Sequence, residues 1–233
     1  MQLFYDPELR AGIHALREAE AQHAARVLRK RSGEVLDLVD GRGGWYQGTI
    51  LDINKRQCSL AVTELRRETA RAPHHTTLLV APTKSIDRFE WILEKVTEIG
   101  LDRIQPVFTE HSERTRLRTD RLERVLESAM KQSLRAWLPE LSEPRPFAEA
   151  LTEVDPQARR FMGYLGQAGV PLLTTLTGAV RSVVAIGPEG GFSPAEAELA
   201  RAHDFSWVSL GPHRLRTETA AITAVHTLES AHW

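Results

Sequence analysis

The spacing of apolar residues changes near residue 75, and this change divides the chain in two. Before that point, short runs of alternating apolar and polar residues predict strands, because alternation with period two places one side of a strand against a core. These strands are predicted over 35–39, 45–53 and 58–63. A helix is predicted over about 20–30. Short antiparallel strands in so few residues favour a small β-barrel.

After residue 75, apolar strands alternate with amphipathic helices. Strands are predicted over 77–81, 104–108, 161–165, 183–186 and 207–210, and helices over 87–99, 119–134 and after each of the last two strands. This alternation predicts an α/β domain with a parallel sheet and helices on both faces. The predicted organisation is therefore a barrel domain over 1–70, a polar linker over 71–75 and an α/β domain over 76–233.

Several helix ends carry recognisable capping residues. Ser193 and Glu196 have the spacing of a capping box, with Pro194 at the first helical position. Asp87 and Glu90 have the same spacing, Gly100 is a predicted C-terminal stop, and Thr217 is a predicted N-cap.

A glycine-rich loop follows the strand predicted over 183–186. Its sequence, 187–192, is Gly-Pro-Glu-Gly-Gly-Phe, and three glycines in five residues allow a ligand to approach the backbone closely. Open α/β sheets bind ligands at the carboxyl ends of their strands, where this loop lies. The spacing fits neither a Walker phosphate loop nor the dinucleotide fingerprint, so it does not support ATP or NAD chemistry. A tight turn into a helix is the alternative.

The next strand leads into a second such loop, 211–220, which is charged and constrained. Loops between a strand end and a helix start commonly carry function. Two of them on neighbouring connections favour a binding site over two simple turns.

Composition restricts the classes of protein and compartment that remain. The net charge is −1 and the single cysteine, Cys58, can form no intrachain disulfide, so a reducing cytoplasm is expected. No apolar run is long enough for a membrane span, no secretion signal is visible, and the histidines lack metal-ligand spacing. Basic residues nevertheless gather in two stretches, 26–31 and 114–135, which fit either solvated helix faces or a surface for phosphates.

The ordered set of motifs resembles one family along nearly the whole chain. It resembles the SPOUT class of knotted RNA methyltransferases and, within it, the family that methylates N3 of a uridine in bacterial 16S ribosomal RNA. The resemblance is carried by His23 with 26–29, by Lys84, Arg88, Lys95 and 97–100, by Gln132, Arg135 and 139–140, and by 187–192, 210–211 and 215–220.

The resemblance implies a small PUA-like barrel and a SPOUT-like domain with a deep trefoil knot. It also implies S-adenosylmethionine as cofactor, a homodimer, and 16S ribosomal RNA or the small ribosomal subunit as partner, with no metal and no membrane. The implied cofactor-binding residues are Leu165, Gly166, Ile186, Gly187, Glu189, Gly190, Leu210, Gly211, Leu215, Thr217 and Ala220. The implied RNA-binding residues are His23, Arg26, Arg29, Lys30, Lys84, Arg88 and Arg135.

The chemistry of uridine N3 suggests the catalytic residues. N3 carries a proton and becomes a good nucleophile only when that proton leaves, so negative charge must be stabilised. A guanidinium is always charged, which makes Arg216 the predicted catalytic residue. Glu218 is predicted to orient Arg216 or accept the proton, although a carboxylate at a helix start is also favoured by the dipole alone. His213 and Arg214 depart from the family pattern, which has arginine and an aliphatic residue there.

Two other functions compete with this hypothesis. A SPOUT enzyme could act on transfer RNA or on a ribose 2′-hydroxyl, and an RNA-binding protein could use the barrel and the basic stretches without catalysis. The basic segment of the small domain favours the ribosomal enzyme over the former, and the intact glycine loops argue against the latter.

Overall fold

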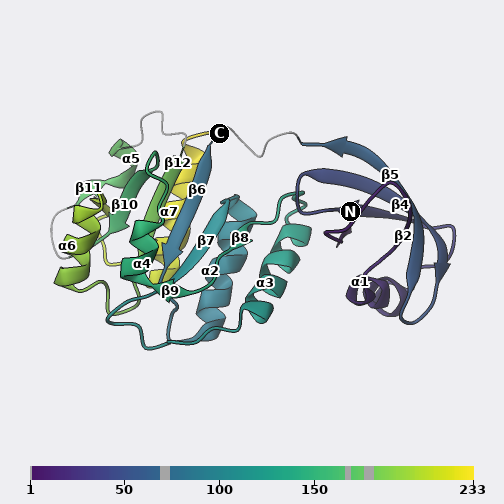
Figure 1. Cartoon of the computed structure of the whole chain (residues 1–233), viewed down its shortest axis with the longest axis horizontal. Coiled ribbons are helices and arrows are strands. Elements are labelled where there is room, and N and C mark those ends of the chain that lie inside the picture. The colour runs from purple at the N-terminus through teal and green to yellow at the C-terminus, as the bar shows by residue number, and fades with distance from the viewer. Residues whose placement is uncertain (1, 69–73, 166–168, 176–180) are drawn as a thin grey trace. The chain divides into compact units, whose positions relative to one another are not determined.

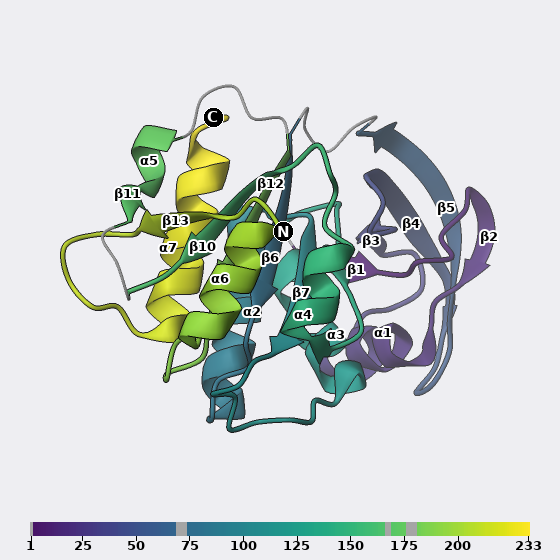
Figure 2. The same cartoon turned by 60° about the vertical axis from the view of Figure 1, so that its left-hand side comes forward.

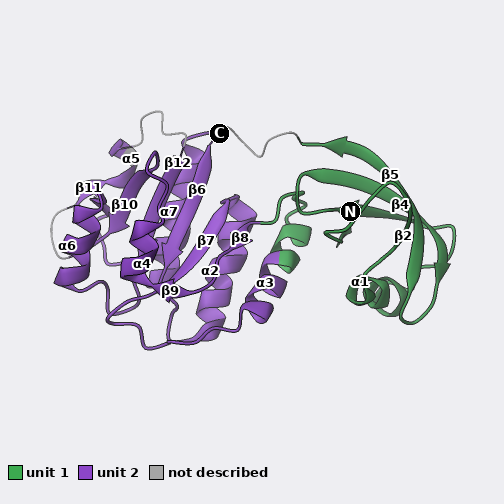
Figure 3. Ribbon diagram, in the orientation of Figure 1, with its two compact units in different colours: residues 1–71, 127–138 green, residues 72–126, 139–233 purple. Residues whose placement is uncertain are grey.

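The computed structural model describes residues 2–68, 74–165, 169–175 and 181–233. The chain divides into two compact units (Figure 3). Each unit has its own core. The small unit contains Met1–Arg71 and Glu127–Leu138, and the large unit contains Ala72–Leu126 and Pro139–Trp233. Most of the predicted linker falls in 69–73, which lies outside the described residues.

The small unit is built on a curved five-stranded sheet (Figure 1). Its strands are β1 (Leu3–Tyr5), β2 (Gly12–Ala15), β3 (Val35–Val39), β4 (Gly44–Ile53) and β5 (Cys58–Arg67), in the order β1-β3-β4-β5-β2. The three predicted strands are confirmed, and Cys58, Leu60 and Val62 face one core. These three strands pair antiparallel as predicted, whereas β1, which the sequence did not predict, pairs with β3 in parallel.

The helix predicted over 20–30 is shorter and irregular. It consists of α1 (Glu18–Gln22) followed by one π-helical segment, His23–Val27. The chain leaves the helix at Leu28 because Arg29 adopts a left-handed φ of 55°, which cannot continue a right-handed helix.

Residues 127–138 pack with the small unit, although the sequence predicted them within the α/β domain. Met130 and Ala136 join a core cluster with β1 residues Leu3 and Tyr5. The amide of Gly43 donates to the carbonyl of Ala136 at 2.9 Å. The division between the units therefore falls inside α3 (Thr119–Gln132). Helical periodicity predicts the helix but not which core its far end joins.

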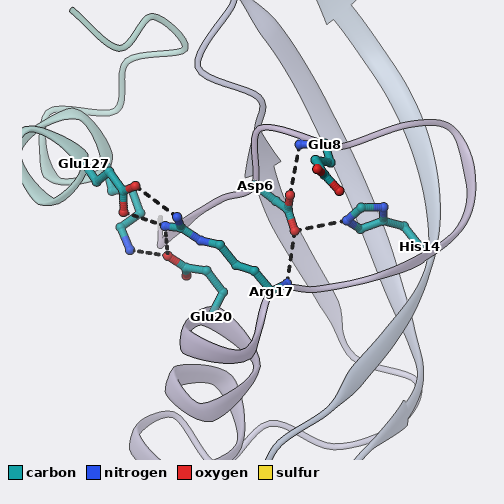
Figure 4. A network of polar contacts seen from close by, with 7 residues as sticks. Asp6, Glu8, His14, Arg17, Glu20 and Glu127 are labelled. Carbon is teal, nitrogen blue, oxygen red and sulfur yellow. Dashed lines mark hydrogen bonds and ion pairs between the residues drawn. The ribbon is translucent and has the colours of Figure 1, made fainter. Parts of the chain in front are cut away.

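Charged side chains reinforce this attachment (Figure 4). Arg17 donates two hydrogen bonds to Glu127, at 2.9 and 2.6 Å, and Glu20 accepts from Arg17 at 3.3 Å and from Lys131 at 2.5 Å. Burial disfavours the charged form of Arg17, but its bonds to Glu127 and Glu20 outweigh this and raise its pKa. Nearby, the Asp6 carboxylate accepts from the amides of Glu8 and Arg17 and pairs with His14.

The large unit contains an eight-stranded sheet in which every described strand pair is parallel, as predicted. Its strands are β6 (His75–Val80), β7 (Arg103–Phe108), β8 (Glu140–Leu141), β9 (Arg145–Pro146), β10 (Arg159–Gly163), β11 (Val170–Pro171), β12 (Arg181–Ile186) and β13 (Ser206–Ser209). The order is β11-β13-β10-β12-β6-β7-β8, with β9 also on β7. The last strand thus lies between two earlier ones; the trefoil knot itself stays a prediction.

Helices cover both faces of this sheet (Figure 2). They are α2 (Ile86–Ile99), α4 (Phe147–Thr152), α5 (Leu172–Thr175), α6 (Pro194–Ala202) and α7 (Thr217–Ser230). Leu79 and Ala185 share a core with α4 and α6. Their neighbours Leu78 and Val184 point to the opposite face, where α7 contacts β6 and β12 and packs on α2.

The predicted helix ends are partly correct. Ser193 and Glu196 form the capping box, and Gly100 ends α2 with a φ of 128°. The box at Asp87 and Glu90 was wrong: α2 begins after Ser85, and both acidic side chains instead pair with Arg121 of α3. A rule based on residue spacing within one helix cannot show that a charged partner lies on a neighbouring helix.

Candidate functional site

The candidate site lies at the carboxyl edge of the parallel sheet in the large unit. Parallel strands end on the same side, so the segments that follow β6, β7, β12 and β13 share one edge. These segments are 81–85, 109–118, 187–193 and 210–216. The sequence identified the last two as site loops; only the sheet order shows that the first two, which contain Lys84 and Arg114, lie at the same edge.

The glycine-rich loop is a tight turn followed directly by α6. The amide of Gly191 donates to the carbonyl of Pro188 at 2.8 Å, and Gly191 has a φ of 72° with open space around its Cα hydrogen. Ser193 then begins the helix with its side chain accepting from the amide of Glu196. A glycine at 191 is therefore required by backbone conformation.

Neighbouring loops hold the glycine-rich loop in place. The Glu189 carboxylate accepts the amide of Lys84 at 3.1 Å. Glu196 uses one oxygen for Ser193 and the other for the amide of Glu110, both at 2.9 Å. Nδ1 of His111 donates to the carbonyl of Gly191 at 3.1 Å. The loop is thus fixed by backbone donors from the β6–α2 and β7–α3 connections.

The sequence suggested that a ligand lies against Gly190, but in the structure the neighbour of Gly190 is the side chain of His111. A β-carbon at Gly190 would lie 2.9 Å from Cβ of His111, closer than real contacts allow. Its small size is therefore required by the packing of His111, whether or not a ligand approaches. Nothing in the sequence relates residues 79 positions apart, so this contact could not be predicted.

Two predicted cofactor-binding residues meet on an apolar surface. A β-carbon at Gly163 would lie 3.1 Å from Cδ1 of Ile186 and 3.9 Å from Cδ1 of Leu210. Gly163, which the sequence did not single out, thus leaves room where β10, β12 and the 210–216 segment converge. Leu165 is 75% exposed, and Gly166 lies outside the described residues.

The second loop begins with a turn that glycine permits. Gly211 has a φ of 146°, and its amide lies 3.3 Å from the Ser209 hydroxyl oxygen. Arg216, not Thr217, is the N-cap of α7, and it makes no side-chain capping bond. Thr217 is the first helical residue, and the carbonyl of Arg216 accepts from the amide of Ala220 at 2.8 Å. The predicted boundary was wrong by one residue.

Leu215 and Gly187 also lie in these two segments. Leu215 is half-buried, and Gly187 packs under Phe192, whose ring carbon would lie 3.0 Å from an added β-carbon. Arg214 contacts the carbonyl of Glu189 at 3.5 Å, which joins the second loop to the first.

Both predicted catalytic residues lie at this edge. The Glu218 side chain is 11% exposed, and its Oε1 lies 4.0 Å from Nη1 of Arg216. The same oxygen lies 3.9 Å from Nε of Arg88, which comes from α2. Oε2 of Glu218 is buried and has no hydrogen-bond partner. The sequence placed Arg88 among RNA contacts and did not connect it with Glu218.

Lys84 also lies at this edge, and its side chain is 72% exposed. It forms an ion pair with Glu113 at 2.8 Å, which raises the pKa of Lys84. Arg114 donates to the carbonyl of Lys84 at 2.8 Å, so one arginine of the basic stretch supports the loop instead of facing solvent alone.

The other predicted RNA-binding residues belong to the small unit: His23, Arg26, Arg29, Lys30 and Arg135. Nε2 of His23 contacts the amide nitrogen of the Gln2 side chain at 3.0 Å. Lys30 pairs with Glu34 at 3.2 Å, whereas Arg26 and Arg29 are exposed.

Among residues 2–68, 74–165, 169–175 and 181–233, no three histidine, cysteine or acidic side chains group as a metal site requires. Within the same described ranges, no helix is long and apolar enough to cross a bilayer.

Family models match both parts of the chain. The model of the RNA methyltransferase domain matches residues 70–229, and that of the RNA methyltransferase PUA domain matches residues 16–63. Together with the parallel sheet and its carboxyl-edge loops, these matches define the class as an RNA methyltransferase with a PUA domain. The predicted PUA-like domain and α/β methyltransferase domain are confirmed.

Individual relatives narrow the class. The Ribosomal RNA small subunit methyltransferase E of Aquifex aeolicus is 32% identical over 98% of this chain and 99% of its own. The solved Ribosomal RNA small subunit methyltransferase E from Neisseria gonorrhoeae, bound to S-adenosyl methionine, is 28% identical with a TM-score of 0.86, covering 99% of this chain and 97% of that one. A probable rRNA-methyltransferase structure from Porphyromonas gingivalis is 38% identical with a TM-score of 0.86, covering 99% of both chains. This chain belongs to the ribosomal RNA small subunit methyltransferase E family.

Proposed function

We propose that the protein transfers a methyl group from S-adenosylmethionine to N3 of a uridine in the 16S RNA of the small ribosomal subunit. The observation that carries this is the convergence of Ile186, Leu210 and the glycine-rich loop at the carboxyl edge of the sheet. Relatives along nearly the full length of the chain are named Ribosomal RNA small subunit methyltransferase E, and one was solved with S-adenosyl methionine, which supports the proposal.

The residues at this edge fit such a cofactor. Ile186 and Leu210 supply an apolar surface for an adenine, and the backbone of the 187–193 and 210–216 loops supplies donors and acceptors for its edge. S-adenosylmethionine supplies a methyl group on a sulfonium, which is reactive enough to need orientation rather than activation. We assign to the cofactor site Leu165, Ile186, Gly187, Glu189, Gly190, Leu210, Gly211, Leu215, Thr217 and Ala220; Gly166, which the resemblance also implies, lies outside the described residues.

The chain's own contribution to the reaction is charge. Removal of the N3 proton leaves negative charge on the uracil, and fixed guanidinium donors stabilise it without reorganisation. Arg216 lies at the edge with its side chain 69% exposed, so it is accessible to an incoming base. We also propose that the protein is a cytoplasmic homodimer whose RNA-facing site uses both copies.

Recombinant protein and ribosomal RNA from a strain lacking the gene provide the test. We expect labelled S-adenosylmethionine to transfer its methyl group, and nucleoside mass spectrometry to identify 3-methyluridine at one position. Naked RNA and isolated small subunits should be compared as substrates. A 2′-O-methylated nucleoside, methylation of transfer RNA alone, or cofactor binding with no methylated product would contradict the proposal.

A further inference from the structure

Two arginines from different elements face one buried carboxylate at the proposed catalytic edge. Arg88 comes from the first turn of α2 and Arg216 from the residue before α7. Their guanidinium nitrogens lie 3.9 and 4.0 Å from the same Oε1 of Glu218. No spacing rule joins residues 88 and 218, so this triad exists only because α2 and α7 pack side by side.

The contacts are ion pairs but not hydrogen bonds, because both distances exceed the usual hydrogen-bond range. Within the described ranges of the chain, no hydrogen bond reaches the Glu218 carboxylate, and its Oε2 is fully buried without a partner. A buried carboxylate without hydrogen bonds is unfavourable, and movement of either guanidinium by less than about 1 Å would correct it. Catalytic contacts that are long in a free enzyme commonly shorten once substrate binds.

We propose that Arg88 is a second catalytic residue that acts with Arg216 on the uracil, and that Glu218 is a positioning residue that holds both guanidinium groups. The proposal rests on the proposed function. Arg88 and Arg216 are 46% and 69% exposed, so each keeps N–H donors that Glu218 does not use. Two forked donors suit a pyrimidine anion, whose charge is shared between its two carbonyl oxygens.

The assignment also decides among the roles considered for Glu218. Both guanidinium groups lie beside the same Oε1 of Glu218, and this shared contact assigns the carboxylate to holding them in place. In the reaction, the N3–H bond breaks and its proton goes to solvent water. The N3 lone pair then forms the bond to the methyl carbon as the carbon–sulfur bond breaks, and that electron pair stays on the sulfur.

Single-turnover methyl transfer at saturating RNA and S-adenosylmethionine separates a catalytic Arg88 from an RNA-binding one. We expect Arg88→Ala to lower the rate about a hundredfold, as for other positioned charge donors, with RNA affinity nearly unchanged. Arg88→Lys should recover only part of the rate, because lysine keeps the charge but not the fork. Arg201→Ala, an exposed arginine on α6, is the matched control and should react like wild type.

The opposite result would identify Arg88 as a phosphate contact and overturn the proposal. In that case the saturated rate of Arg88→Ala would equal that of wild type, RNA would bind more weakly, and the slope of log affinity against log salt would flatten by about 0.7.

The pH dependence tests Glu218 independently. Glu218→Gln keeps the size of the side chain and removes its charge. For Glu218→Gln we expect a lower rate at every pH and an unchanged shape of the pH–rate profile. Because Glu218 acts through Arg88, the rate loss of the double variant Arg88→Ala with Glu218→Gln should be smaller than the sum of the two single losses in free energy. Loss of an ionisation from the profile would show that Glu218 is the proton acceptor and would overturn its positioning role. If wild type methylates a nucleoside other than uridine at N3, the proposed function fails, whereas the same variants on that nucleoside still test the shared triad.

Discussion

Single residues in this protein are constrained by contacts with distant parts of the chain. Asp40 in the small unit is 3% exposed, and its carboxylate accepts four hydrogen bonds. The donors are the amides of Arg42 and Gly44, the Tyr46 hydroxyl and the Arg67 guanidinium. Burial alone would raise the pKa of Asp40, but these bonds together lower it below 3.8. Asp40, which lies between β3 and β4, therefore organises this connection as a buried anion.

We predict that Asp40→Asn lowers the free energy of unfolding by about 2 kcal/mol at pH 7, because an amide cannot accept all four bonds. The pKa of Asp40 is lower in the folded protein than in the unfolded chain. The stabilisation that the ionised carboxylate gives to the folded protein is therefore complete above pH 3.8, and it is lost as the pH falls through the pKa of the folded protein. Urea denaturation at pH 7 and pH 3 should show a smaller difference between wild type and variant at pH 3. If the stability difference between wild type and Asp40→Asn were equal at pH 7 and pH 3, the stabilising role of the ionised Asp40 carboxylate would be contradicted. Asp52→Asn, on the exposed face of β4, is the control.

At the level of loops and helices, the glycine-rich loop shows that one small residue can satisfy two requirements. Gly190 leaves room for His111, and the proposed cofactor also requires its backbone to be accessible. The two requirements predict different outcomes in a double variant.

We predict that Gly190→Val abolishes S-adenosylmethionine binding and lowers the melting temperature, and that adding His111→Gly recovers thermal stability without restoring binding. The β-carbon of the valine clashes with Cβ of His111, so removing that carbon at residue 111 relieves the packing but leaves a branched side chain on the loop. Calorimetric titration and a melting curve on the same samples give both quantities, and His111→Gly alone is the control. Recovery of binding in the double variant would mean that Gly190 serves packing only.

The basic stretch 26–31 of the small unit is predicted to bind RNA phosphates, and the salt dependence of RNA binding tests this. Lys30 already pairs with Glu34, so Arg26 and Arg29 should dominate any contact with phosphates. On single-stranded RNA each phosphate contact contributes about 0.7 to the salt slope, so Arg26→Ala with Arg29→Ala should flatten the slope by about 1.4 and adding Lys30→Ala should change it little. Titrations of RNA binding at several salt concentrations, from low to physiological, measure the slope of log affinity against log salt. If Lys55→Ala with Arg56→Ala, in the β4–β5 turn, has the same effect, the segment is an ordinary charged surface.

For the molecule as a whole, the small unit is assembled from two distant parts of the sequence. Residues 1–71 contain Glu20, which is 3% exposed, but its ion-pair partner Lys131 lies 111 residues further along the chain, next to the core residue Met130. Cutting the chain at the domain boundary that the sequence predicts would leave this carboxylate partly unpaired and uncover part of a core.

We predict that a fragment of residues 1–71 unfolds without a cooperative transition, whereas the same fragment joined by a flexible linker to 127–138 melts cooperatively. The fragment loses Lys131 as a partner of Glu20, Glu127 as a partner of Arg17 and Met130 from a core, and the total stability of a domain is only about 5–15 kcal/mol. Thermal melts followed by circular dichroism compare the two fragments, and a linked 127–138 segment carrying Lys131→Ala and Met130→Ala is the control. Equal cooperativity of all three fragments would show that 127–138 contributes nothing to the small unit.

Local sequence information was sufficient wherever neighbouring residues decide the structure. The strands β3, β4 and β12, the amphipathic helix α2 and the Ser193–Glu196 cap were all predicted correctly, since period and capping depend on residues a few positions apart. The glycine loops and the family followed from short motifs in a fixed order. Long-range packing decided the rest: which core residues 127–138 join, that His111 lies against Gly190, and that Arg88 shares Glu218 with Arg216. Strand order and charge pairing between elements bring these residues together, and neither leaves a pattern that can be found within a single segment of the chain.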